Sequence, residues 1–548
     1  MNAYESRPWL AHYPSGLSEH LDVEFGSPLD MFDAALAAAP DGPAIRYFGA
    51  TLSWADLDAA SDALAHALQA HGFAAGDRLG IAVQNGPSIV LGLLAAWKTG
   101  GVAALISPMY KRSEFRRALD DFTPSALLVL DNVHAEVADE IAVTGSIGLV
   151  ITVSPLDFAG NDDLRRVFEV SRVPAAAGTV ELLDLIATGS REVSRHVPAP
   201  DDVAVLAPTS GTTGPPKGAK LMHRNLAFSA QAYRDWTGLK SGEPILCMSP
   251  VFHVTGLVGS VMLALSLRSP LILTHRFDAG LVLDAVRVWR PAFSVAAITA
   301  YIALADHPDA SPEAFSSLRL RYSGGAPVPP EVAERVAERL GGMIHNVYGQ
   351  TESTSPTHMV PPGVLAPVDP ETGALSVGLP IFDTTARVVD ENGDPVPPGT
   401  FGEIVTAGPQ IAAGYWGQVD DGGSALMNGE MRTGDVGFMD ADGWFYVIDR
   451  SNDLINASGY KIWPFEIEQV LQSHPAVRET AVVGIPDDYR GESTRAYVAL
   501  QPGAEVSATE LIEFCRKRMA AYKYPREIEI VGALPRSATG KVLRRELR

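Results

Sequence analysis

Residues 209–218 read Thr-Ser-Gly-Thr-Thr-Gly-Pro-Pro-Lys-Gly, directly after an apolar run at 203–207 that is typical of a buried strand. Glycines, hydroxyls and one lysine on such a loop can surround phosphate oxygens with backbone N–H groups, side-chain hydroxyls and a positive charge. The loop is not a Walker loop, because that motif needs Gly where Pro216 stands and Ser or Thr where Gly218 stands. The sequence therefore predicts a phosphate-binding loop but disfavours a P-loop kinase or GTPase.

The chain before about residue 350 alternates between helical and strand periods. Ser53 can cap a helix that runs to about His71, because apolar residues recur there every three or four positions. Further predicted elements are strands at 78–83, 102–106, 126–130, 203–207 and 271–273, and helices at 89–98 and 112–121. Strand, helix and strand at this spacing predict a parallel sheet with crossover helices.

The character of the chain changes after about residue 360. Short predicted strands at 386–389 and 401–406, with turn residues between them, indicate a small antiparallel β unit. A further break falls near 449–452, and the helices and strands predicted beyond it form a compact α+β unit. Residues 450–548 carry 15 basic and 13 acidic side chains, so this last unit is the one suited to a polyanionic ligand.

Composition excludes several classes of protein. The chain has 548 residues, of which 46% are hydrophobic and 20% charged, as in ordinary globular proteins and unlike disordered chains. A net charge of -22 disfavours a nucleic-acid or anionic-membrane partner. Two cysteines cannot form a disulfide framework. No targeting segment is visible, and the apolar stretch at 254–267 is too short for a membrane span, so a cytoplasmic location and a buried helix are expected.

Other segments accompany the phosphate-binding loop in a fixed order. They are Tyr-Ser-Gly-Gly-Ala-Pro at 322–327, Asn-Val-Tyr-Gly-Gln-Thr-Glu at 346–352, Thr-Gly-Asp at 433–435, the region 449–468, and Pro-Arg-Ser-Ala-Thr-Gly-Lys at 535–541. Together they resemble, over nearly the whole chain, the motifs of the adenylate-forming enzymes. That superfamily includes acyl-CoA synthetases, firefly-luciferase-like proteins and the adenylation domains of peptide synthetases.

The resemblance implies an α/β fold with two domains. The large N-terminal domain, residues 1–449, would contain two α/β subdomains and a distorted β subdomain. The small mobile α+β C-terminal domain, residues 450–548, would turn about a hinge near Arg450 to Asn452. The family usually has Lys or Asp where this chain has the uncharged Asn452.

The resemblance also implies the chemistry. An acid and ATP would form an acyl-adenylate, and the thiol of CoA would then take the acyl group. Negative charge accumulates where the carboxylate meets the α-phosphate, so catalysis is mostly positioning and charge neutralisation. Lys541 would bridge these two groups, Thr351 would hydrogen-bond the α-phosphate, and Glu352 would hold Mg²⁺. His253 would lie beside the acyl carboxylate and the path of the thiol.

Nucleotide and CoA contacts follow from the same motifs. Asp435 would grip the ribose hydroxyls, Tyr348 and Asn346 would meet adenine, and Arg450 would donate to ribose or phosphate oxygens. The ATP- and CoA-binding residues expected from the resemblance are Thr209, Ser210, Gly211, Thr212, Thr213, Lys217, Gly325, Ala326, Pro327, Asn346, Tyr348, Gly349, Asp435, Arg450, Ser458, Gly459 and Tyr460.

The resemblance favours the acyl-CoA synthetase branch, with ATP, Mg²⁺ and CoA as cofactors and a small carboxylic acid as substrate. No carrier domain follows Arg548, which favours CoA as the acceptor. Residues 108–128 resemble medium- and long-chain enzymes, and the small residues Gly324, Gly325, Gly349 and Ser353 are expected to leave room for a large acid, aliphatic or aryl.

Alternatives stay open at this point. They are an aryl-CoA ligase, a stand-alone acyl-AMP ligase that loads a carrier protein, a luciferase-like oxygenase and a non-catalytic nucleotide-binding protein. No nucleic-acid partner and no transmembrane segment are expected, and the sequence leaves a homodimer open.

Overall fold

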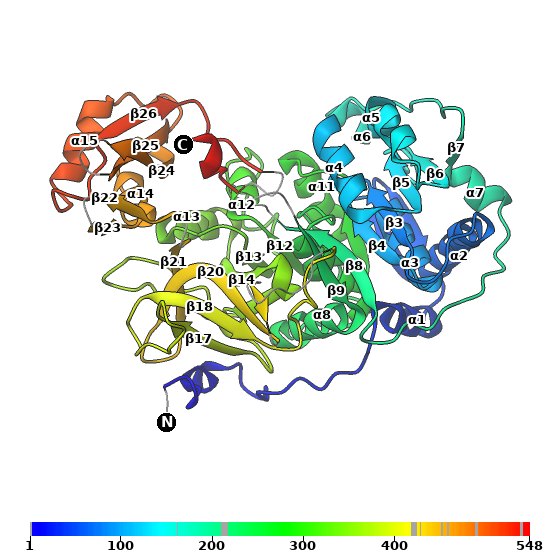
Figure 1. Cartoon of the computed structure of the whole chain (residues 1–548), viewed down its shortest axis with the longest axis horizontal. Helices are drawn as coiled ribbons and strands as arrows, with labels where there is room; N and C mark the ends of the chain where they lie inside the picture. Colours follow the sequence, from blue (N-terminus) through cyan, green and yellow to red (C-terminus); the bar gives the residue numbers. More distant parts are fainter. Residues whose placement is uncertain are drawn as a thin grey trace.

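Four β-sheets form the framework of the residues that the structure describes. The computed structural model describes residues 3–161, 163–209, 217–417, 425–427, 429–450, 453–457, 460–487, 491–537 and 541–548. Figure 1 shows two helix-covered sheets, a smaller β unit beneath them, and a small domain at the end of the molecule that carries the C-terminus.

The first sheet carries the phosphate-binding loop. Its strands, in spatial order, are β7 (Thr179–Glu181), β6 (Leu149–Val153), β5 (Ala126–Leu130), β3 (Arg78–Ala82), β4 (Val102–Leu105), β8 (Val203–Pro208) and β9 (Gly218–Met222). All neighbouring pairs are parallel except β8 and β9, which are antiparallel. The helices that follow its strands are α3 (Pro87–Lys98), α4 (Arg112–Phe122), α5 (Asp131–Thr144), α6 (Asp163–Phe168) and α7 (Leu182–Thr188). The predicted parallel sheet with crossover helices is therefore confirmed, with an antiparallel edge at the loop.

Local signals in the sequence explain several of these helices. Ser53 caps α2 (Trp54–Ala70), and Asp56 returns a hydrogen bond to the backbone of Ser53, which completes a capping box. By contrast, α3 is apolar except for Ser88 and Lys98, and all of its residues are buried. A helix of that kind can only lie inside a large domain.

The second sheet carries the adenine and magnesium motifs. Its strands, in spatial order, are β16 (Leu379–Pro380), β15 (Ser355–Met359), β14 (His345–Gln350), β13 (Leu320–Ser323), β12 (Phe293–Ala296), β10 (Ile245–Cys247), β11 (Leu271–Leu273), β1 (Pro43–Tyr47) and β2 (Ala50–Ser53). Its helices are α1 (Pro28–Ala38), α8 (His223–Thr237), α9 (Val254–Gly256), α10 (Leu263–Ser266), α11 (Ala279–Trp289), α12 (Ile298–Ala305) and α13 (Pro330–Leu340). Polar motif residues gather at the end of β14, so the functional site is expected there.

The apolar stretch at 254–267 is a buried helix, as predicted. It is continuous from α9 through a π-helical segment, η2 (Leu257–Met262), into α10. Such π-helical turns often mark functional sites. Among the described residues, no helix combines the length and the apolar character needed to cross a membrane.

A third sheet and a fourth sheet follow in sequence. The third contains β17 (Thr385–Val389), β18 (Gly402–Ala407), β19 (Leu426–Met427), β20 (Glu430–Met439) and β21 (Phe445–Arg450). The fourth contains β22 (Ile455–Ala457), β23 (Tyr460–Ile462), β24 (Val477–Asp487), β25 (Gly491–Leu500) and β26 (Glu527–Val531), with α14 (Pro464–Gln472) and α15 (Ala508–Arg516) beside them. The sheets thus change between Arg450 and Ile455; the domain boundary at 449 and 450 and the mobility of the last domain stay predictions.

Candidate active site

The two ends of the phosphate-binding loop are tied together. Thr209 donates its backbone N–H to the carbonyl of Lys217, and Lys217 donates its N–H to the hydroxyl oxygen of Thr209 at 3.0 Å. These bonds close the hairpin between β8 and β9. Ser210, Gly211, Thr212 and Thr213, which the sequence assigns to phosphate binding, lie outside the described residues.

Lys217, Tyr415 and Glu352 form a chain of contacts beside this loop. The Lys217 ammonium lies 4.9 Å from the centre of the Tyr415 ring, and the Tyr415 hydroxyl donates to Glu352 Oε1 at 3.0 Å. Burial and the neighbouring Glu352 raise the pKa of Tyr415, so its hydroxyl keeps its proton. Tyr415 thereby links Lys217, which is expected to bind phosphate, to Glu352, which is expected to bind magnesium. No sequence motif singled out Tyr415, whose hydroxyl orients the Glu352 carboxylate.

The adenine motifs lie on adjacent strands, since Asn346 and Tyr348 belong to β14, and Gly325 to Pro327 follow β13. Gly325 has a φ of 82°, a left-handed conformation that glycine adopts without strain. Asn346 donates its side-chain N–H to the carbonyl of Ser376, whereas its buried Oδ1 meets no donor among the residues that the structure describes. A buried acceptor of this kind fits an exocyclic amino group such as that of adenine.

Asp435 is the centre of the polar site. Its buried carboxylate accepts hydrogen bonds at Oδ2 from the Tyr348 hydroxyl and from the Gln350 amide, each at 2.7 Å. Its Oδ1 lies 3.0 Å from Nε of Arg450, the last residue of β21. Burial and Asp435 raise the pKa of Tyr348 well above its usual value, so Tyr348 stays a neutral donor. Gln350, whose role was not anticipated, therefore helps to orient Asp435.

Lys541 lies in the same group of charges. Burial and Arg450 lower the pKa of Lys541 to about 8, while Asp435 acts in the opposite direction. Its backbone is tied to Ser537, which donates to the Lys541 carbonyl at 2.8 Å. Lys541 and the expected ribose residue Asp435 thus share one electrostatic environment, and their roles stay predictions. In Figure 1 the last residues, drawn in red, lie on the side of the small domain that faces the rest of the molecule.

His253 and Thr351 are the two remaining residues that the sequence assigns to catalysis. His253 precedes α9, and burial lowers its pKa to about 4, so its imidazole is neutral at physiological pH. Thr351 begins η3 (Thr351–Ser353), directly after Gln350 at the end of β14. A neutral imidazole can accept or donate a hydrogen bond but cannot neutralise a carboxylate. A neutral His253 therefore cannot supply positive charge to an acid substrate.

The expectation that small residues leave room for a large acid is wrong at three positions. A Cβ atom on Gly349 would lie 1.6 Å from the carbonyl oxygen of Ser355, and one on Gly324 would lie 2.7 Å from that of Val347. Ser353 is fully buried, and its hydroxyl donates to the Ser355 carbonyl at 3.0 Å. Neighbouring backbone fills this space, so these small residues reflect close strand packing.

The expected CoA residues are only partly described. Ser458 and Gly459 lie outside the described residues, and Tyr460 is described as the first residue of β23 without its side chain. The hinge residue Asn452 also lies outside the described residues.

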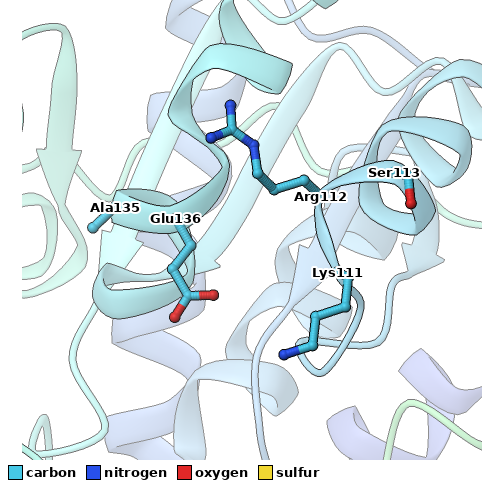
Figure 2. A pocket seen from close by; sticks show the side chains of 5 residues that line it. All are labelled: Lys111, Arg112, Ser113, Ala135 and Glu136. Carbon is cyan, nitrogen blue, oxygen red and sulfur yellow. The ribbon is translucent and has the colours of Figure 1, made fainter.

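A separate depression of about 650 Å³ lies between α4 and α5. Figure 2 shows Lys111, Arg112, Ser113, Ala135 and Glu136 around it. Arg112 pairs with Asp139 and Glu140 of α5 at 2.8 and 3.0 Å. None of the expected catalytic or nucleotide-binding residues lines this depression.

Comparison with known proteins identifies the family to which these motifs belong. A family model described as AMP-binding enzyme matches residues 32–416, and a second, described as AMP-binding enzyme C-terminal domain, matches residues 466–541. The chain belongs to the AMP-binding enzyme family. The expected superfamily and the fold, a large N-terminal domain with a small C-terminal domain, are thereby confirmed.

Relatives within the AMP-binding family indicate the class of enzyme. The long-chain-fatty-acid–CoA ligase of Bacillus subtilis is 32% identical, with 99% of this chain and 97% of the relative covered. The feruloyl-CoA synthase of an Amycolatopsis species is 34% identical, with 93% of this chain and 96% of the relative covered. The predicted enzyme class, an ATP-dependent acid–CoA ligase, is confirmed at this level.

One solved relative is known in two states. ATP-bound MatB from Rhodopseudomonas palustris is 26% identical and superposes with a TM-score of 0.83, with 95% of this chain and 98% of MatB covered. Its apo form has the same coverage, 27% identity and a TM-score of 0.74. The present structure is therefore more similar to the ATP-bound form than to the apo form.

Proposed function

We propose that this AMP-binding enzyme converts a medium- or long-chain or bulky aryl carboxylic acid to its CoA thioester in two steps. The observation that carries the proposal is the ion pair of Asp435 and Arg450, whose charges both act on Lys541. In the first step the acid oxygen attacks the α-phosphorus of ATP, the bond to the β-phosphate breaks, and pyrophosphate leaves. In the second step the CoA thiol attacks the acyl carbon, the thiol proton is lost, and AMP leaves.

Each charged group has a part in this scheme. Lys541 neutralises the junction between the acid and the α-phosphate, where two negative groups must approach one another. Asp435 binds the ribose, while Tyr348 and Asn346 bind adenine. Asp435 already accepts from three donors, and a carboxylate has about four acceptor sites. If Asp435 accepts a hydrogen bond from each of two ribose hydroxyls, one of its present donors, such as Arg450, therefore has to move away from the carboxylate.

The magnesium site consists of Glu352 and the phosphates of ATP. Among the described residues there is no cluster of three side chains that could hold a metal ion. Mg²⁺ commonly binds through one or two carboxylates plus substrate phosphates, so a single oriented carboxylate fits. The ion would supply positive charge to the phosphates; this chain supplies Glu352 and holds it through Tyr415.

The acid class is supported by the relatives, whose names specify long-chain fatty acids and ferulate. A stand-alone ligase that loads a carrier protein is the alternative, because it differs only in the acceptor. We also propose a cytoplasmic location, which rests on the sequence composition, and keep a homodimer as a proposal.

A pyrophosphate-release assay tests the function. Purified protein is supplied with ATP, Mg²⁺ and one of a panel of acids that includes acetate, dodecanoate, hexadecanoate, benzoate and ferulate, with and without CoA. We expect release with the longer or aryl acids and formation of the matching acyl-CoA when CoA is present. Release without any thioester would favour a carrier-protein acceptor, and no release with any acid would refute the proposal.

A further inference from the structure

One partly buried arginine near the C-terminus pairs with three carboxylates. Arg544 is the first residue of η5 (Arg544–Glu546) and follows Lys541 by three positions. Its Nη1 donates to Asp449 at 3.0 Å and to Asp453 at 3.2 Å, and its Nη2 donates to Glu468 at 2.7 Å. Although burial opposes the charged form, Glu468, Asp449 and Asp453 raise the pKa of Arg544.

The three carboxylates come from different parts of the chain. Asp449 belongs to β21, which pairs with β20 in the third sheet, next to the pair of Asp435 and Arg450. Asp453 follows the predicted hinge, and Glu468 lies on α14 of the small domain. The Arg544 side chain therefore connects the last strand of the large domain to the small domain. The only other donor from beyond the hinge that is described at Asp449 is the backbone N–H of Phe465, at 3.2 Å.

The segment that presents Lys541 is held by backbone hydrogen bonds directly before Arg544. Ser537 donates to the Lys541 carbonyl, and Leu543 donates to the Pro535 carbonyl, each at 2.8 Å. These bonds pair the two arms on either side of residues 538–540, and Arg544 immediately follows the second arm. The charges that act on Lys541 are Arg450, Asp435, Arg544 and Asp453, so lysine and arginine share one environment. A shift of Arg544 would move Lys541 relative to Asp435.

We propose that Arg544 is a positioning residue for adenylate formation. It holds the arm that carries Lys541 against the large domain through its pair with Asp449, in the arrangement closer to that of ATP-bound MatB. That pair breaks when the small domain turns to admit CoA, while the contacts with Glu468 within the small domain persist. The proposal rests on the two-step function proposed above.

The alternative is that Arg544 is a brace, a residue that only stabilises the small domain. Measuring the two half-reactions separately distinguishes this structural role from the positioning role. A brace would affect both half-reactions through loss of folded protein. A positioning residue would affect adenylate formation alone, because Lys541 is needed there and a supplied acyl-adenylate bypasses it. Removing one partner of a buried ion pair is costly, so the variants must retain as many contacts as they can.

The test uses the full-length protein with Arg544→Gln and Asp449→Asn. Asp449→Asn keeps the shape of the side chain and leaves Arg544 paired with Asp453 and Glu468. Arg545→Gln is the matched control, because Arg545 is the next residue of η5 and is exposed. Dodecanoate- or ferulate-dependent pyrophosphate release reports the first half-reaction, and CoA capture of the corresponding supplied acyl-adenylate reports the second.

We expect both site variants to lower the rate of pyrophosphate release by about 10²-fold, the scale for misplacing a catalytic group by about 1 Å. CoA capture should change less than threefold, and Arg545→Gln should match wild type in both. Equal losses in both half-reactions, or unchanged pyrophosphate release, would overturn the proposal. If neither site variant folds, as judged by circular dichroism, Arg544 is a brace and the proposal is wrong. A wild-type protein without pyrophosphate release refutes the proposed function itself, whereas an active wild type whose variants lose both half-reactions equally refutes only this inference.

Discussion

The charge of Lys541 should make adenylate formation sensitive to alkaline pH. Its pKa is lowered to about 8, first by burial and then by Arg450. Only the protonated amine can neutralise the acid and the α-phosphate, so activity is present below pH 8 and lost above it. The protonated fraction is about 90% at pH 7 and about 10% at pH 9, so kcat/KM for ATP should fall about tenfold over that range.

Raising the pH changes the contribution of Lys541 to stability in the direction opposite to its change in activity. A lysine whose pKa is lowered in the folded protein is more easily deprotonated there than in the unfolded chain. Its burial therefore opposes folding while it is charged, and this cost fades as the pH rises through about 8. A decline of activity between pH 8 and 9 consequently cannot come from the effect of Lys541 on stability.

The assay is acid-dependent pyrophosphate release at limiting ATP from pH 7 to pH 10, because the profile of kcat/KM reports ionisation in the free enzyme. Lys541→Arg is the control: its guanidinium stays charged over this range, so its lower plateau should be flat. Lys541→Ala should lower release by about 10²–10³-fold at pH 7 but spare CoA capture of a supplied acyl-adenylate. A flat wild-type profile, or an equal alkaline decline in Lys541→Arg, would refute the reasoning.

Three further substitutions test other parts of the site. Asp435→Ala should raise KM for ATP by about 10–100-fold, the scale of a lost charge-assisted hydrogen bond, and leave KM for the acid unchanged in initial-rate measurements; an unchanged KM for ATP would exclude the ribose role. Gly349→Ala should lower the free energy of unfolding by about 1–3 kcal/mol in urea denaturation, because its Cβ would meet backbone, whereas Gly532→Ala, in open space, should change it little. Equal effects of the two would contradict the packing argument. Tyr415→Phe should raise the Mg²⁺ concentration needed for half-maximal activity by about tenfold, since it frees Glu352; an unaltered magnesium titration would remove Tyr415 from the site.

Much of the fold could be predicted from the sequence because it depends on short segments of the chain. The helix cap at Ser53, the helix at 89–98 and the alternation of strands and helices are properties of short segments, and each was found where expected. The motifs likewise assigned Asp435 and Lys541 to one nucleotide site, and the charges of these two residues, which are far apart in the chain, act on each other in the structure.

Hydrogen-bond partners that are distant in sequence, and the space beside a glycine, could not be predicted in the same way. Gln350 and Tyr415 act by orienting carboxylates that are distant in sequence, and no local pattern distinguishes such a side chain from a solvent-exposed one. Gly349 illustrates the second limit. A glycine leaves room either for a ligand or for another backbone, and only the position of the Ser355 carbonyl decides between them.

The charges around the predicted hinge support two arrangements of the small domain, one for each proposed half-reaction. Asp435 and Arg450 both act on the charge of Lys541, which the proposed reaction places beside the α-phosphate of ATP. In the proposed second step the thiol of CoA has to reach the acyl carbon attached to that phosphate, so we expect Lys541 and its arm to move away after adenylate formation. Moving Lys541 out requires the contact between Arg544 and Asp449 to break, because this ion pair joins the arm to the large domain. Since Arg544 retains Glu468 as a partner within the small domain, its charge does not become unpaired when the contact with Asp449 is lost. The free-energy cost of turning the small domain is therefore lower than the burial of the three carboxylates alone would suggest.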